Sequence, residues 1–394
     1  MTRATVALFL SLSSAVALAD LWGTLEPGGH VPGFRTINLV DDFRAADGRE
    51  SPEGRPLQIS VWYPAAPPAD EAAEAMRIAD YVHLTAREHS VGTEPISASE
   101  AAAAEATVAA FPLETVDEAA LRQMLGLAGR AIPDARPAGA TYPALVILPG
   151  NHDPAWRHFV LAEYLASHGY VVAAIPSASR RVRAAMEMSF GYGPFRDQMN
   201  DAAFAIDFMR AEDPQVDPAR VMLFGFSIGG NTGGNNLLRD RDVAGFVCLD
   251  CGIGSTWGTP YLNEVREKTF PSAARRRLAI LHISKGGERN DDSFIDGFEA
   301  ATAYHSIVDD ALHFNFTSLG AVAAEIPAIR HEQWLASGRF ARQVHDQSVH
   351  RVRLFLDAHL KDDANAGTAL ERTDPGERVH FHRISRPRSA DVGK

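Results

Sequence analysis

Cysteine is the scarcest informative residue in this 394-residue chain, which contains only Cys248 and Cys251. With two cysteines the chain cannot be a small scaffold held together by several disulfides. One pair also supplies only two of the four protein ligands that a structural zinc site needs. The two residues are three apart at the end of an apolar run. We therefore expect two small buried side chains near a strand end, with a local disulfide as the alternative.

Positive charge is also in deficit, because 38 Lys and Arg stand against 50 Asp and Glu, for a formal net charge of -12. A protein that binds nucleic acid needs a basic face, so we expect no nucleic-acid partner. The hydrophobic content of 46% and the charged content of 22% are those of a globular protein. The length allows one large domain or two ordinary ones.

Long apolar runs are missing except at the N-terminus, where Met1-Thr2-Arg3 precedes a mostly apolar stretch over residues 4–16. Ala17-Leu18-Ala19 then fits the small-x-small rule for signal peptidase. The pattern predicts a signal peptide over residues 1–19, cleaved between Ala19 and Asp20. The stretch is short and rich in serine for a transmembrane helix, although an uncleaved anchor is the alternative. We expect an exported protein, periplasmic or extracellular, with no stable membrane span in the mature chain.

The apolar periodicity predicts an α/β fold with a mostly parallel central sheet flanked by helices. Alternation with period two predicts two neighbouring antiparallel strands over residues 34–40 and 57–63. From residue 142 onward, buried-type strands alternate with helical segments, as in a parallel sheet covered on both faces. The predicted strands cover residues 144–148, 170–175, 221–224, 245–249, 278–283 and 310–316. The predicted helices cover residues 156–168, 198–210, 294–305 and 344–360.

We predict a single domain over residues 20–362 that carries one insertion. Residues 70–135 are rich in Ala and Glu and have helical spacing, which predicts a helical insertion. That insertion is either a cap over the functional site or a surface embellishment. Residues 363–394 are polar and are expected to form a peripheral C-terminal tail.

A G-x-S-x-G pattern, Gly225-Phe226-Ser227-Ile228-Gly229, directly follows the apolar run 221–224. A serine on a sharp strand-to-helix turn needs small residues two positions away on either side, because larger side chains would collide there. The turn holds the Ser227 hydroxyl clear of the sheet and directs the next backbone N–H, that of Ile228, at the same space. Ser227 is therefore the predicted nucleophile and Ile228 a predicted oxyanion donor. The alternative is a glycine-rich loop with a solvated serine.

A serine nucleophile needs a base, and the base needs an orienting acid. Asp250 ends the first predicted strand after Ser227 and is the favoured acid. Glu288, Asp291 and Asp292 follow the next strand and stay open as alternatives, although they resemble a solvated charged turn.

The predicted base is His313, which falls on the last predicted strand. His282 lies inside a strand and fits a packed core residue, and His305 falls near the end of a predicted helix. His380 and His382 form an H-x-H pattern without a nearby third ligand, so we predict no metal site. No cofactor is expected.

The second oxyanion donor should come from the loop after the strand 144–148, where Gly150 permits a close backbone turn. We assign it to the N–H of Asn151. Side chains expected to touch substrate are those of His152 in the same loop and Phe226 beside the nucleophile. An apolar, glycine-hinged loop adds Phe190 and Tyr192.

These residues resemble the α/β-hydrolases, and among them the secreted bacterial relatives of platelet-activating-factor acetylhydrolase and dienelactone hydrolase-like esterases. Val61-Trp62-Tyr63-Pro64 resembles an early V-W-Y-P of that group, and residues 225–230 are similar to its G-H-S-F-G-G elbow. Leu249-Asp250 resembles its acid, and His313-Phe314-Asn315-Phe316 its H-x-x-F. The chain departs from the group in two places: Phe226 stands where the elbow usually has histidine, and Leu148-Pro149-Gly150 replaces a His-Gly oxyanion loop.

The resemblance implies a Ser227–His313–Asp250 triad that hydrolyses carboxylic esters, of short-acyl or lipid-like type, through an acyl-enzyme. The expected partner is a small ester. The alternatives are dienelactone, polyester or amide hydrolysis on the same triad, or a non-catalytic binding protein with the same fold.

Overall fold

The computed structural model describes residues 20–42, 54–68, 73–88, 94–110, 112–177, 192–239, 242–256, 275–287 and 290–387. The predicted signal peptide, residues 1–19, lies outside the described residues. Asp20, the predicted first mature residue, is where the description begins.

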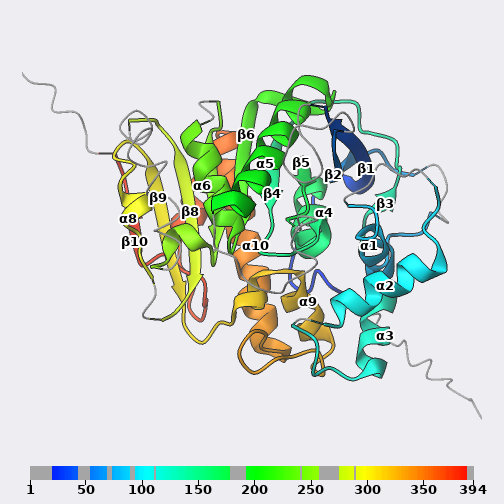
Figure 1. The fold of residues 1–394 in the computed structure, drawn as a ribbon. Coiled ribbons are helices and arrows are strands. Elements are labelled where there is room, and N and C mark those ends of the chain that lie inside the picture. The colour runs from blue at the N-terminus through cyan, green and yellow to red at the C-terminus, as the bar shows by residue number, and fades with distance from the viewer. Residues whose placement is uncertain are drawn as a thin grey trace, which may run out of the picture.

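One large twisted sheet runs through the described part of the chain (Figure 1). Its strands are β1 (Val31–Asp41), β2 (Arg55–Ala65), β3 (Ile132–Pro133), β4 (Tyr142–Leu148), β5 (Val171–Ala174), β6 (Val216–Phe226), β7 (Gly245–Leu249), β8 (Ala279–Lys285), β9 (Thr302–Val308) and β10 (Arg383–Ser385). Their order across the sheet is β10-β9-β8-β7-β6-β4-β5-β2-β1-β3. The strands from β4 to β9 are mutually parallel, whereas β2, β1 and β10 join antiparallel. The predicted α/β class with a mostly parallel sheet is therefore confirmed.

The central strands are buried on both faces, which explains their continuous apolar sequences. In β4, Leu145 and Ile147 belong to one core, whereas Val146 and Leu148 belong to the core on the opposite face. The alternation follows from the two-residue period of a strand.

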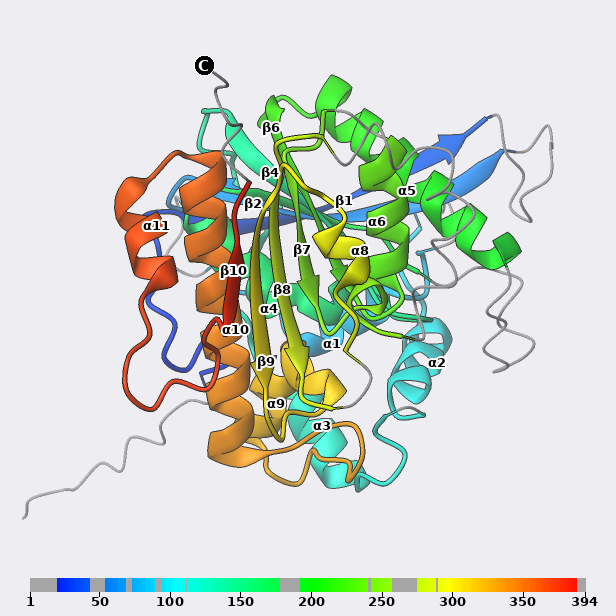
Figure 2. The ribbon, with the colours of Figure 1, turned by 90° about the vertical axis from the view of Figure 1, so that its left-hand side faces the viewer.

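Helices cover both faces of the sheet, as Figure 2 shows for β6 to β10. One face is covered by α4 (Phe159–Ser167), α9 (Ser318–Glu325) and α10 (Gly338–Leu360). The other is covered by α5 (Tyr192–Glu212), α6 (Gly229–Arg239) and α8 (Ser293–Asp296). None of the helices in the described segments has both the length and the apolar character needed to cross a bilayer.

Between β2 and β4 the chain forms three helices, α1 (Ile78–Leu84), α2 (Ala98–Val108) and α3 (Glu118–Gly126), grouped below β3 in Figure 1. Helix α1 and the chain after α3 are attached to the core through Glu163 of α4, whose side chain is fully buried. Its carboxylate accepts hydrogen bonds from Tyr81 Oη at 2.8 Å, from Trp22 Nε1 at 3.2 Å and from the backbone N–H groups of residues 130 and 131. One acidic side chain thus joins the N-terminal segment, the helical insertion and the core.

Two predicted elements near the C-terminal half are wrong. Residues 294–305 do not form a helix: α8 ends before Gly297, and Thr302 begins the strand β9. The helical spacing in that segment yields to sheet pairing, because β9 gains backbone partners along β8 and then from β10. Residues 310–316 do not form a strand; the 3-10 helix η5 (His313–Phe316) follows β9 instead.

The C-terminal segment is less peripheral than its polar sequence suggests. It forms α11 (Ala364–Glu371) and then β10, which completes one edge of the sheet. Leu370 and Val379 are fully buried, and the Arg351 guanidinium of α10 donates to the carbonyl oxygens of Leu370 and Arg372. These contacts and the pairing of β10 with β9 attach the segment to the rest of the fold.

Candidate active site

The turn at Ser227 has the geometry of a nucleophile elbow. Ser227 follows β6 directly, precedes α6 and has a φ of 54°, the left-handed region that a side chain normally disfavours. A Cβ on Gly225 would lie 2.6 Å from Cα of Gly230, and a Cβ on Gly229 would lie 1.9 Å from the carbonyl oxygen of Leu148. The glycines of the motif are therefore required because backbone fills the space around them.

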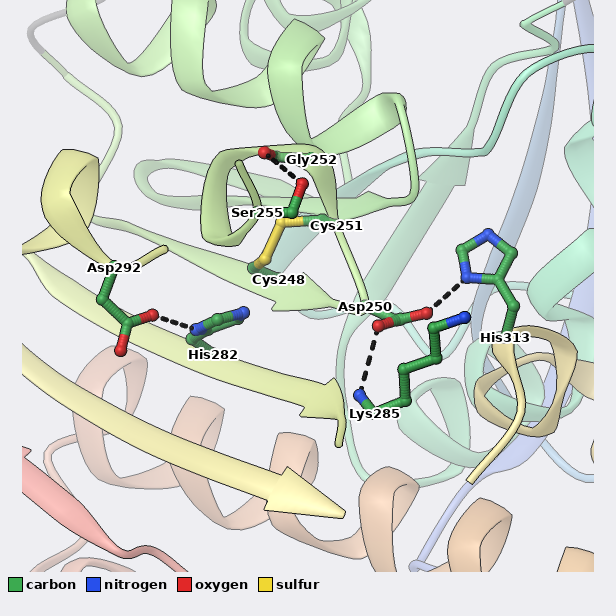
Figure 3. The surroundings of a disulfide bond; sticks show 9 residues. All are labelled: Cys248, Asp250, Cys251, Gly252, Ser255, His282, Lys285, Asp292 and His313. Carbon is green, nitrogen blue, oxygen red and sulfur yellow. Dashed lines mark hydrogen bonds and ion pairs between the residues drawn. A yellow bond between two sulfur atoms is a disulfide. The ribbon is translucent and has the colours of Figure 1, made fainter. Parts of the chain in front are cut away.

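Asp250 and His313 form a hydrogen-bonded pair, with Oδ2 of Asp250 2.5 Å from Nδ1 of His313 (Figure 3). Asp250 stands just after β7 and His313 opens η5, so the two residues come from neighbouring parts of the same sheet edge. Oδ1 of Asp250 accepts a hydrogen bond of 3.1 Å from the backbone N–H of Lys285. Both carboxylate oxygens are thus occupied, and the acid is fixed in orientation.

The electrostatics of this pair favour an ionised acid. Burial opposes the charged form of Asp250, whose side chain is 10% exposed. The hydrogen bond and charge of His313, together with Lys285, outweigh that burial, and the pKa of Asp250 is lowered. A charged acid that accepts from Nδ1 leaves Nε2 of His313 as the free nitrogen for base chemistry.

Phe226 packs on His313 from the core side, whereas the sequence predicted that its side chain touches substrate. Its ring is fully buried and stacks on His313, with centroids 4.4 Å apart and an angle of 25° between the planes. It also packs edge-on against the buried His158. As the last residue of β6, Phe226 points into the core on the α4 face, where it supports His313. Trp334 flanks His313 from another side, at 6.1 Å between ring centroids.

Cys248 and Cys251 are buried, as expected, and they are joined by a disulfide, the alternative that the sequence left open (Figure 3). The Cα atoms lie 5.5 Å apart because the chain turns at the end of β7. Asp250 stands between the two cysteines. After the turn, the backbone N–H of Gly252 donates to the carbonyl oxygen of Ser227 at 2.8 Å. The acid turn and the elbow are therefore in direct contact.

The predicted oxyanion loop lies beside the elbow. The hypothetical Cβ of Gly229 would also approach the carbonyl oxygen of Pro149, at 2.5 Å. A Cβ on Gly150 would meet Asp153 Oδ2 at 2.6 Å and the ring of Phe226 at 3.1 Å. Asn151 and His152 are exposed at the tip of this loop. The oxyanion donors assigned to the N–H groups of Asn151 and Ile228 stay predictions.

A buried ion pair directly after the predicted oxyanion loop holds that loop in place. Asp153 Oδ1 lies 2.7 Å from Nε of Arg157, and both side chains are almost fully buried. The hydroxyl of Ser177 donates to the carbonyl oxygen of Gly150 and accepts from the N–H of Asp153. The roles of Arg157 and Ser177 could not be predicted from the sequence, because they depend on contacts that only the fold creates.

The helical insertion contacts the segments that carry the site. Glu88 Oε1 accepts from the backbone N–H of Ala155 at 2.7 Å, and Trp156 Nε1 donates to Thr85 Oγ1 at 3.2 Å. Oε1 of Glu114 lies 3.5 Å from Nε2 of His331, in the loop that leads to Trp334. The insertion therefore touches both the chain after the oxyanion loop and the chain that flanks His313.

The rival acids lie elsewhere. Asp291 accepts from the N–H of Ser293 through Oδ1, and Glu288 lies outside the described residues. Asp292 is not part of a solvated turn: its carboxylate oxygens lie 2.9 Å from Nδ1 of His282 and 3.1 Å from Nδ1 of His305. Burial opposes its ionisation, but these hydrogen bonds and charges prevail, and the pKa of Asp292 is strongly lowered.

The group His282, Asp292 and His305 has ligand atoms close enough to hold a metal ion, all within 4.8 Å of one another. However, Nη2 of Arg383 lies 2.8 Å from Oδ2 of Asp292 and 3.2 Å from Nδ1 of His305. The Arg383 guanidinium binds two of the atoms that a metal ion would need. We therefore interpret this group as an ion-pair cluster that attaches β10 to the sheet. Sequence reasoning missed it because His305 was expected in a helix, whereas it lies on β9 opposite His282.

Phe190, a predicted substrate contact, lies outside the described residues. Tyr192 begins α5, and its side chain is also outside the description.

Comparisons with known proteins identify the fold. A scan against family models finds no match, and a comparison with curated protein sequences finds none either. Among solved structures, a ferulic acid esterase from Streptomyces cinnamoneus superposes with a TM-score of 0.63 at 21% sequence identity. The alignment covers 91% of this chain and 98% of the esterase. The chain therefore has the α/β-hydrolase fold.

Proposed function

We propose that the chain is a serine hydrolase that cleaves carboxylic esters through an acyl-enzyme, with Ser227, His313 and Asp250 as its triad. The observation that carries the proposal is the Asp250–His313 hydrogen bond of 2.5 Å beside a left-handed serine turn. Nucleophile, acid and base follow along the chain as Ser227, Asp250 and His313, which is the order that this fold uses. The fold likeness to an esterase adds support.

In the acylation step, Nε2 of His313 takes the hydroxyl proton while Oγ of Ser227 attacks the ester carbonyl carbon. The carbonyl oxygen becomes an oxyanion, held by the backbone N–H groups of Ile228 and Asn151. Asp250 keeps the imidazolium in place and balances its charge. As the tetrahedral intermediate collapses, His313 returns the proton to the departing alcohol, and the acyl group stays on Ser227.

Deacylation repeats the sequence with water. His313 takes a proton from the water molecule, whose oxygen attacks the acyl carbon. Ser227 leaves with the proton held on Nε2, and the carboxylic acid is released. No other group is consumed, so the chain's own residues complete the cycle.

Two likenesses, one in sequence motifs and one in fold, bear on the substrate class. The motif resemblance favours short-acyl or lipid-like esters, and the fold neighbour is named for ferulic acid esters. We therefore expect turnover of simple aryl acetates and place hydroxycinnamate esters in the same panel. Dienelactones, polyesters and amides complete it as alternatives on the same triad.

Export is part of the proposal. The N-terminal segment has the pattern of a signal peptide, and the Cys248–Cys251 disulfide suits an oxidising compartment. Mass spectrometry of the native protein should give a mature chain that starts at Asp20. A retained residue 1–19 segment would overturn the export proposal.

The central test is Ser227→Ala with a fluorophosphonate probe. We expect the wild-type chain to hydrolyse p-nitrophenyl acetate and to bind the probe covalently at Ser227. The variant should lose both while keeping the same thermal unfolding midpoint. Ser99→Ala, an exposed serine of α2, is the matched control and should keep both. A folded wild-type chain with neither probe adduct nor turnover would favour the binding-protein alternative.

A further inference from the structure

The disulfide and the proposed catalytic acid share one four-residue segment. Cys248 lies on β7, Cys251 precedes the 3-10 helix η3 (Gly252–Gly254), and Asp250 stands between them. The backbone N–H of Asp250 donates to the carbonyl oxygen of Ile283 at 2.7 Å, which continues the sheet pairing by one residue. The chain therefore leaves the sheet at Asp250, the proposed catalytic acid.

The backbone of Asp250 needs to be held. Its φ of 41° is left-handed, which is unfavourable for a residue with a Cβ atom. Three extended residue steps would span about 10 Å, whereas the Cα atoms of the two cysteines are 5.5 Å apart. A covalent link across the turn removes the extended conformations and leaves the compact ones that include the left-handed residue.

The same turn is packed against the nucleophile. A Cβ on Gly230 would lie 2.3 Å from Cβ of Cys251, so this cysteine fills the space next to the first turn of α6. The N–H of Gly252 donates to the carbonyl oxygen of Ser227 at 2.8 Å. Any movement of the cysteine turn would therefore reach both the acid and the elbow.

We propose that the Cys248–Cys251 disulfide is a positioning element of the active site, which holds Asp250 on His313, and that full ester turnover requires this bond. The inference rests on the proposed function and adds a redox requirement to the same triad. Reduction would break the S–S bond with two electrons and two protons taken from a dithiol, which becomes a disulfide itself, and would leave two thiols. The freed turn could then carry Asp250 away from Nδ1 of His313.

The bond is poorly accessible, because Cys248 is 0% and Cys251 3% exposed. A dithiol will therefore reduce it slowly in the folded protein, and a variant without the bond gives the cleaner test. The Cys248→Ala/Cys251→Ala double variant removes the link and both sulfur atoms. Wild-type protein reduced during partial unfolding, refolded under the dithiol and checked by thiol counting keeps the sulfur atoms and lacks only the link.

We expect both preparations to show a kcat for p-nitrophenyl acetate about tenfold lower, with KM changed by less than about twofold, because the link touches the acid rather than the substrate. In the Asp250→Asn background, removal of the disulfide should cause no further loss, since the group it positions is already gone. The far-downfield proton resonance of the Asp250–His313 hydrogen bond should weaken or disappear in the double variant while circular dichroism stays unchanged.

Two results would overturn the inference. One is a double variant with a lower thermal unfolding midpoint and unchanged kcat in its folded state, which would make the bond a stabilising link only. The other is an equal loss on removing the disulfide in the Asp250→Asn background, which would separate the bond from the acid. A wild-type, oxidised chain that hydrolyses no ester would instead overturn the proposed function.

Discussion

Replacing Asp250 by asparagine tests the triad through a specific consequence of its two hydrogen bonds. Oδ1 accepts from the N–H of Lys285 at 3.1 Å and Oδ2 faces Nδ1 of His313 at 2.5 Å. The amide introduced by Asp250→Asn has one acceptor oxygen and one NH2 donor. Its oxygen should face the backbone N–H of Lys285, because the opposite orientation would set two donors against each other. The orientation with the NH2 group facing the N–H of Lys285 would cost about 1–3 kcal/mol.

With the oxygen at Lys285, the NH2 group donates to Nδ1 of His313. The ring proton must then sit on Nε2, the nitrogen that should accept the proton of Ser227. The base is held in the wrong tautomer, and we expect kcat to fall about ten-thousandfold. This loss corresponds to about 5.4 kcal/mol of transition-state stabilisation.

The assay is steady-state hydrolysis of p-nitrophenyl acetate, with the rate of fluorophosphonate labelling as a second measure of the same base. Asp291→Asn is the matched control in the rival loop and should stay within about threefold of wild type. Asp250→Asn with more than a tenth of wild-type activity, together with a severe loss in Asp291→Asn, would refute the assignment and move the acid to the later loop.

Three further outcomes follow from the fold. Gly229→Ala places a methyl group 1.9 Å from the carbonyl oxygen of Leu148, so it should cost about 3 kcal/mol or more and sharply reduce soluble yield; normal yield and thermal midpoint would contradict the steric argument. Tyr81→Phe removes one donor from the buried Glu163 and the acceptor of the buried Trp62 Nε1, and it should lower the free energy of unfolding by about 2–3 kcal/mol in urea titrations, whereas a loss below about 0.5 kcal/mol would show that this link is dispensable. The folded-state pKa of Asp292 lies below that of an unfolded carboxyl, so its stabilisation is complete above about pH 4 and is lost as the pH falls further. The stability advantage of wild type over Asp292→Asn should therefore shrink as the pH falls below about 4, and a difference that stays constant from about pH 4 to about pH 2 would count against this linkage.

The parallel sheet and the elbow could be predicted because their signals are local. Buried strands such as β4 and β7 are continuous apolar runs, and the glycines of residues 225–229 satisfy a steric need within a few residues. The place of Asp250 at the sheet edge could be predicted because it directly follows a buried parallel strand. His313 was expected on a strand over residues 310–316, whereas the structure has a 3-10 helix there, and only the fold places this residue next to Asp250.

The parts that could not be predicted depend on contacts distant in sequence. The strand β9 resembles a helix in its spacing, and only its neighbours β8 and β10 make it a strand. The cluster around Asp292 could not be found without β9 and Arg383, which is 91 residues away. The burial of Phe226 likewise follows from the core beneath β6 and not from its place in the motif.

The burial of Glu163 sets a limit on how this protein could be rebuilt. Its carboxylate is shared by the N-terminal segment, the helices between β2 and β4, and the chain at residues 130–131. Removing the whole insertion over residues 70–135 would take away Tyr81 and the N–H groups of residues 130 and 131, and would leave the buried Glu163 carboxylate with Trp22 Nε1 as the remaining one of these four donors. The insertion is therefore not a detachable module, and a shortened or chimeric version would need an apolar replacement for Glu163 at the same time. The same hydrogen bonds would have to break for this insertion to swing away from the core like a hinge, so such an opening should be costly.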